Sequence, residues 1–114
     1  MSIDYAYEKF YLAVIGMAKS KKKLRGRIED AYVYNVIHVR EEDIPEHHLN
    51  DFRILKEMVT CRPARHSGEG TVRATTQQMS PRQLDEAASL VVELFDAISS
   101  AYREQEDRAL RPRG

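Results

Sequence analysis

The first stretch of the chain has apolar residues at the helical period. Five of them follow one another at alternating spacings of four and three: Ile3, Tyr7, Phe10, Val14 and Met17. This spacing places the side chains on one face of a helix. Asp4 and Glu8 lie near its start, where the helix dipole favours negative charge. The pattern predicts a helix over residues 2–18.

A broader apolar stripe follows over residues 24–39. Its positions are Leu24, Ile28, Ala31, Tyr32, Asn35, Val36 and Val39. The residues 32–39, YVYNVIHV, are also rich in β-branched and aromatic side chains, which is typical of a strand. Glu29, Asp30 and Arg40 fall outside the stripe, and this favours the helix.

Asn35 is the polar member of that stripe. A buried amide needs a hydrogen-bond partner, because burial without one costs a few kcal/mol. Asn35 would either bond to a tyrosine or the backbone within the fold, or form a polar layer across a symmetric dimer, as buried Asn does in coiled coils.

The third predicted helix covers residues 45–59. Asp43 is its expected N-cap and Pro45 lies in its first turn. Its apolar face comprises Ile44, His48, Phe52, Leu55 and Val59. Residues 60–79 then lack a strong period, which predicts a long loop that is partly disordered without a partner. Within it, residues 71–76, TVRATT, predict a short strand or an extended arm.

The last helix has the clearest signals. Ser80, Pro81 and Gln83 form an N-cap, a proline at the first helical position and a capping box. Its apolar face comprises Leu84, Ala87, Ala88, Val91, Leu94, Phe95, Ile98 and Tyr102. We predict an all-α fold: residues 1–105 form one small antiparallel bundle of about four helices with a long loop before the last helix, and residues 106–114 form a frayed tail.

Composition narrows the class of protein. The chain has 114 residues, with 18 Lys and Arg against 18 Asp and Glu, so its net charge is zero and it is not a generally basic nucleic-acid coat. Cys61 is the single cysteine, which excludes an intramolecular disulfide and a Cys-based zinc cage. The longest apolar run, residues 10–18, is far shorter than the about 20 residues that span a bilayer. We therefore expect a cytoplasmic protein without a cofactor or bound metal.

Two basic segments are candidates for an anion site. The first comprises Lys19, Lys21, Lys22, Lys23, Arg25 and Arg27, and the second comprises Arg62, Arg65 and Arg73. If the fold brought them together, they could neutralise several phosphates of a nucleic acid. The alternatives are that the lysine run is a solvated surface, or that it pairs with the acidic residues 41–46.

Residues 40–47, REEDIPEH, carry a possible catalytic pair. An arginine and a histidine that enclose six residues resemble the motif of the HEPN superfamily, small bacterial all-helical proteins that include RNases of toxin–antitoxin systems. The resemblance implies an RNase in which Arg40 and His47 act on the phosphodiester. Four acidic residues and Pro45 lie in the gap, and carboxylates there would repel a phosphodiester. We assign no family on this match.

Some apolar residues fall outside the predicted core faces. They are Tyr5 and Leu12 in the first helix and Val33 and Ile37 in the second. Such side chains on charged faces predict a dimer interface, with Val33, Asn35 and Ile37 at its centre. The expected function is that of a non-enzymatic module that self-associates and binds a partner protein. The alternative is an RNA-binding protein or a HEPN-like RNase.

Overall fold

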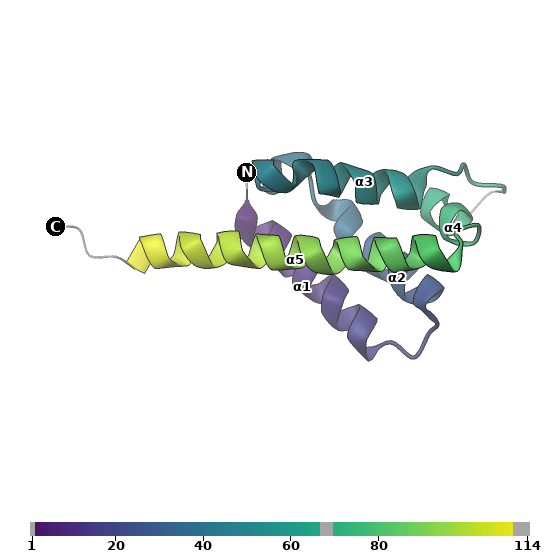
Figure 1. Ribbon diagram of the computed structural model, residues 1–114, viewed down its shortest axis with the longest axis horizontal. Coiled ribbons are helices and arrows are strands. Elements are labelled where there is room, and N and C mark those ends of the chain that lie inside the picture. The colour runs from purple at the N-terminus through teal and green to yellow at the C-terminus, as the bar shows by residue number, and fades with distance from the viewer. Residues whose placement is uncertain (1, 67–69, 111–114) are drawn as a thin grey trace.

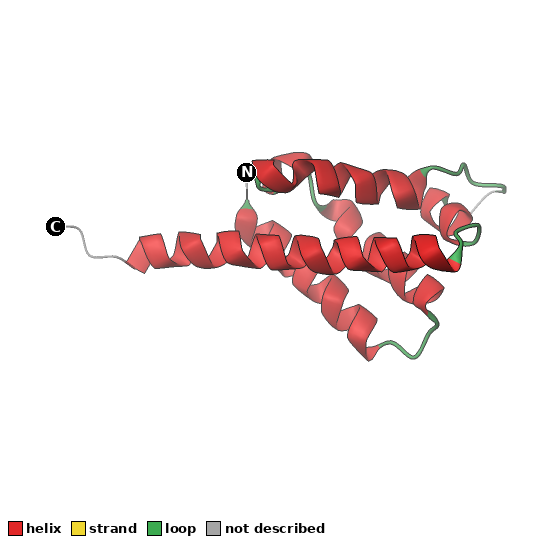
Figure 2. Ribbon diagram, viewed as in Figure 1, coloured by secondary structure: helices red, strands yellow, loops and turns green. Residues whose placement is uncertain are grey.

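The computed structural model describes residues 2–66 and 70–110, and these are helical with short connections (Figures 1 and 2). The α-helices of this part are α1 (Ile3–Lys19), α2 (Leu24–Tyr34), α3 (Leu49–Thr60), α4 (Thr71–Thr76) and α5 (Pro81–Leu110). Three short 3-10 turns lie between α2 and α3: η1 (Val36–His38), η2 (Glu41–Asp43) and η3 (Glu46–His48). No strand occurs among the described residues, so the all-α prediction is confirmed.

The long helix α5 organises the fold. In Figure 1, α3 runs alongside α5 and α1 crosses behind α5 at an angle, and both pack against it. The shorter helices α2 and α4 contact each other at the end where α5 begins, and α4 also packs on α3. The predicted bundle of four helices is therefore only partly confirmed, because α2 is shorter than expected and α4 is an additional helix.

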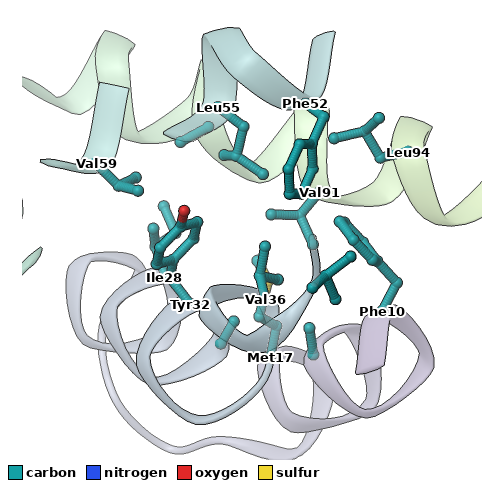
Figure 3. Packing of buried hydrophobic residues seen from close by; sticks show 14 of the residues in the cluster. Phe10, Met17, Ile28, Tyr32, Val36, Phe52, Leu55, Val59, Val91 and Leu94 are labelled. Atoms are coloured by element: carbon teal, nitrogen blue, oxygen red, sulfur yellow. The ribbon is translucent and has the colours of Figure 1, made fainter. Parts of the chain in front are cut away.

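The core lies between α1, α2, α3 and α5. Figure 3 shows side chains from all four helices and η1 converging there: Phe10, Met17, Ile28, Tyr32, Val36, Phe52, Leu55, Val59, Val91 and Leu94. The predicted faces of α3 and α5 are the buried ones. On α1, Ala6 and Ala13 are fully buried while Tyr7 and Val14 lie at the edge of the core. Small alanine side chains let neighbouring helices approach closely. A pattern of hydrophobic residues does not take this effect of side-chain size into account.

Asp43 does not cap α3, contrary to the prediction. Its carboxylate is buried and accepts backbone N–H bonds from Ser2 (3.0 Å) and Arg40 (3.1 Å), so it joins the start of α1 to η2. The helix α3 begins later, at Leu49. Ile44 is extended, as expected of a residue before proline, and Pro45 is extended too, so no helix can start there.

The helix α2 ends before the predicted position. Helix was the right choice over strand, but the regular turns stop at Tyr34, and Asn35 is the C-cap with φ −132° and ψ −67°. Three β-branched residues then follow within four positions, and these have low helix propensity. Asn35 is therefore half-buried at the end of α2, not enclosed within its apolar stripe.

The segment TVRATT forms the helix α4, so the predicted strand or extended arm is wrong. Gly70 begins the helix with a φ of 78°, a conformation that favours glycine. The hydroxyls of Thr75 and Thr76 donate to the carbonyls of Thr71 (2.8 Å) and Arg73 (3.2 Å). These bonds satisfy two buried threonines within the helix. Residues 67–69 of the predicted loop lie outside the described residues.

The start of α5 is as predicted, and its end is not. The Ser80 amide donates to Gln83 Oε1 (2.8 Å) and the Gln83 amide donates to Ser80 Oγ (3.2 Å), which is the capping box. The helix continues to Leu110, past the expected start of the frayed tail at residue 106. Contacts with α1 support this extension, since the Gln105 amide group donates to Asp4 Oδ1 (3.1 Å). Residues 111–114 lie outside the described residues.

Candidate functional site

The first basic segment forms the link from α1 to α2. Lys22 Nζ donates to Asp30 Oδ2 (2.8 Å), which raises the pKa of Lys22, and Arg27 Nε donates to the Lys22 carbonyl (3.0 Å). Both bonds fold the link back on α2. Lys19, Lys21 and Lys23 are exposed.

The acidic residues 41–46 do not pair with these lysines, contrary to one of the sequence-based alternatives. Glu41 pairs with Arg53 (2.6 Å), and this contact lowers the pKa of Glu41. Glu42 pairs with Arg40 (3.5 Å). Glu41 and Glu42 thus have basic partners on α3 or nearby in sequence, and Lys22 pairs with Asp30 instead.

The helix α4 lies between the two basic segments. The Arg25 guanidinium donates to the carbonyl of Thr76, and the Arg62 amide donates to Thr75 Oγ1 (2.9 Å). Arg25 is half-buried by this contact, whereas Arg62, Arg65 and Arg73 are exposed. The fold therefore brings both segments to the same end of the molecule.

Arg40 and His47 lie on separate turns. Arg40 precedes η2 and its side chain pairs with Glu42, while His47 is exposed within η3. Pro45 stands between the two turns in extended conformation. Although both residues belong to the described part of the chain, no hydrogen bond joins their side chains.

A cavity of about 640 Å³ opens between α2, η1, α3 and α4. Its apolar lining comprises Tyr32, Val33, Tyr34, Ile37, Val39, Phe52 and Val72. Its charged lining comprises Glu29, Asp30, Lys56 and Arg73. Volumes of about 300–1,000 Å³ are usual for small-molecule sites. This cavity is therefore the best-formed candidate site in the described part of the chain.

The charged groups of the cavity differ in burial and pairing. Glu29 is half-buried, and its Oε1 atom is shielded from solvent and accepts no hydrogen bond from any residue that the structure describes. Asp30 is paired with Lys22. Lys56 and Arg73 are exposed.

Tyr32 contributes an uncharged side chain to the wall of the cavity. The residue is only 4% exposed, and burial raises the pKa of its phenol to about 12. A group with this pKa stays protonated near neutrality and is a poor general base there. The arrangement is suited to binding more than to proton transfer.

Exposed apolar side chains gather at the mouth of the cavity. Val33, Tyr34 and Ile37 are 37%, 69% and 50% exposed, and all three also line the cavity. Tyr5 and Leu12 on α1 are 37% and 42% exposed. The prediction that Tyr5, Leu12, Val33 and Ile37 lie outside the core is therefore confirmed, while their role as an interface stays a prediction.

The sequence indicated only some of the residues that line the cavity. Val33, Ile37 and Arg73 were singled out as interface or anion-binding candidates, and the structure places them around one cavity. Glu29 and Lys56 were missed. They carry no motif, and they come together only because α4 packs beside α2 and α3.

The comparisons with known proteins found no relative. Neither a scan against protein-family models, nor a search of curated proteins, nor a search of solved structures gave a match. Within residues 2–66 and 70–110, no helix is both long and apolar enough to cross a bilayer. No group of three or more His, Cys, Asp or Glu side chains in these ranges is placed to hold a metal ion.

Proposed function

We propose that this chain is a non-enzymatic, cytoplasmic interaction module that forms a dimer and binds a partner protein through the edge of α2 and η1. The observation that carries this proposal is the strip formed by Val33, Tyr34 and Ile37, three exposed apolar side chains within five positions. Clusters of exposed apolar side chains are typical of interaction surfaces.

The cavity beside this strip distinguishes it from the other exposed apolar residues. Interfaces gain most of their affinity from a few side chains, often aromatic, that fill pockets on the partner. The cavity is lined in part by Val33, Tyr34 and Ile37. The same surface therefore offers a second copy both projecting side chains and a cavity. A two-fold dimer uses the same patch twice, which this combination allows.

Light scattering over a range of concentrations tests the proposal with a matched pair of variants. Ile37 on η1 and Val92 on α5 are both 50% exposed. We expect Ile37→Glu to weaken dimerisation by about a hundredfold, since the new charge would have to be buried, while Val92→Glu has no effect. A monomer at high micromolar concentration, or equal effects of the two variants, would contradict the proposal.

RNA binding is the second candidate function, and the position of α4 favours it. Because Arg25 and Arg62 both bond to this helix, the two basic segments form one end of the molecule. RNA binding would weaken steeply as salt rises, and replacing Lys21, Lys22 and Lys23 by Ala would weaken it for all sequences alike. A HEPN-like RNase would further require Arg40 and His47 for cleavage but not for binding. We expect only micromolar, non-specific RNA binding at physiological salt.

A further inference from the structure

Glu29 has a carboxylate oxygen that lacks a donor. Its Oε1 atom is shielded from solvent without a hydrogen bond from the described residues, although the residue lines the cavity. An unsatisfied buried acceptor is costly, and more so when it is charged. Because Glu29 lines the cavity, a donor bound there lies beside this carboxylate. A ligand with a positively charged donor would satisfy it.

The walls next to Glu29 are apolar and aromatic. Tyr32, Val39 and Phe52 line the cavity and are almost fully buried. Such walls exclude water and strengthen an ion pair formed between them. The faces of aromatic rings also attract cations. An ammonium group carried on an apolar body fits this environment.

The mouth of the cavity has the opposite charge. Asp30 is already paired with Lys22, whereas the cations of the lining, Lys56 and Arg73, form no salt bridge with another described residue. Both are exposed, whereas Glu29 is half-buried. From the interior outward, the cavity thus presents a carboxylate, apolar walls and two cations.

We propose that the cavity binds a small zwitterionic ligand with an apolar body, which is the chemistry of a hydrophobic amino acid or a short apolar peptide. Its ammonium group pairs with Glu29 in the interior. Its carboxylate faces Lys56 and Arg73 at the mouth. This proposal does not rest on the dimer, because the cavity is formed within one chain.

The direct test is a titration of the isotope-labelled protein, followed by NMR at concentrations where the chain is monomeric. The probes are L-phenylalanine, the dipeptide phenylalanyl-leucine, and the same dipeptide with an acetylated amino group or an amidated carboxyl group. We expect saturable shifts at residues around the cavity, binding at least about tenfold weaker after acetylation, and a smaller loss after amidation. Tighter binding of the amino acid or of the dipeptide identifies the natural size of the ligand.

Variants assign the two charges to their residues. Glu29→Gln should abolish the preference for the free amino group, whereas Glu57→Gln, an exposed position on α3 outside the cavity lining, should change nothing. Replacing both Lys56 and Arg73 by Ala should remove the preference for the free carboxyl group and most of the salt dependence.

The proposal is overturned if neither unmodified probe gives saturable shifts at the cavity, or if acetylation leaves the affinity unchanged. These results come from the natural chain, so they hold even where a variant fails to fold. A longer peptide that binds with its amino end free, when the amino acid and the dipeptide do not, would also overturn it in favour of a protein terminus.

Discussion

Different kinds of interaction join α1 to α5 and α2 to α4. Along α1 and α5 the contact is aromatic and apolar: the Tyr7 ring stacks on that of Tyr102, with centroids 4.3 Å apart and planes at 6°, and Phe95 lies 6.0 Å from Tyr7. Between α2 and α4, a hydrogen bond from Arg25 to the Thr76 carbonyl crosses the contact, and the cavity lies beside it.

The contact between α1 and α5 contributes to stability, whereas the region around α4 contains the candidate binding site. Stacking of the half-buried rings of Tyr7, Phe95 and Tyr102 between two long helices contributes to folding. The helix α4 is short, and a cavity remains where it meets α2 and α3. The cavity, the unsatisfied oxygen of Glu29 and the exposed strip of Val33, Tyr34 and Ile37 are all found at that end.

The largest expected effect comes from the core beside α1. Phe10 is fully buried and its ring lies 6.4 Å from that of Phe52. Phe10→Ala should lower the free energy of unfolding by about 3–5 kcal/mol, measured by urea denaturation. Val72→Ala at the border of the cavity should cost less than half as much, because fewer atoms are removed and the site is already open. Similar losses would mean that the two ends contribute equally to stability.

Alkaline pH should destabilise the core around Tyr32 of α2. The pKa of Tyr32 is about 12 in the fold and 10.0 ordinarily, so the fold favours the neutral phenol. The resulting contribution to stability is complete below pH 10 and is lost as the pH rises through 12. It amounts at most to about 3 kcal/mol.

Urea denaturation at several pH values, with Tyr32→Phe beside the natural protein, measures this contribution. The variant should show a shallower decline of stability above pH 10, because phenylalanine has no proton to lose. Equal declines would show that the Tyr32 phenol ionises as easily in the fold as in the unfolded chain.

A smaller and local effect is expected at α4. Arg25→Ala removes the donor to the Thr76 carbonyl and should cost about 1–2 kcal/mol. Hydrogen exchange should accelerate in α4 and remain unchanged in α5. Arg27→Ala is the matched control, because the side chain of Arg27 donates to the Lys22 carbonyl in the link before α2 and not to α4. Uniform acceleration throughout the chain would show that α4 is part of one cooperative core.

The sequence predicted those parts of the fold that depend on neighbouring residues. The helices α1 and α5 follow from their apolar period, and the capping box follows from Ser80 and Gln83. The carboxylate of Asp43 was misplaced because its partner, the Ser2 amide, lies 41 positions away. The helix α4 was missed because threonine favours strands. In the fold, the hydroxyls of Thr75 and Thr76 donate to carbonyls of the same helix.

The site was harder to predict than the helices. Exposure of Val33 and Ile37 follows from their place off the apolar stripe of α2. Glu29 and Lys56 have no local signal, since their meeting depends on where α4 packs. A helix of six residues with four buried side chains is decided by tertiary contacts more than by propensity.

Hydrogen exchange of the natural protein at low and high concentration tests most directly that the end formed by α2, α3 and α4 is the interaction surface. The amides of His38 and Val39, which bond to the carbonyls of Asn35 and Val36 in a single 3-10 turn, are suitable reporters. We predict that residues 33–39 gain protection as concentration rises, while residues around Tyr5, Leu12 and Val92 do not. Protection gained on α1 or α5 without any change at residues 33–39 would contradict this assignment.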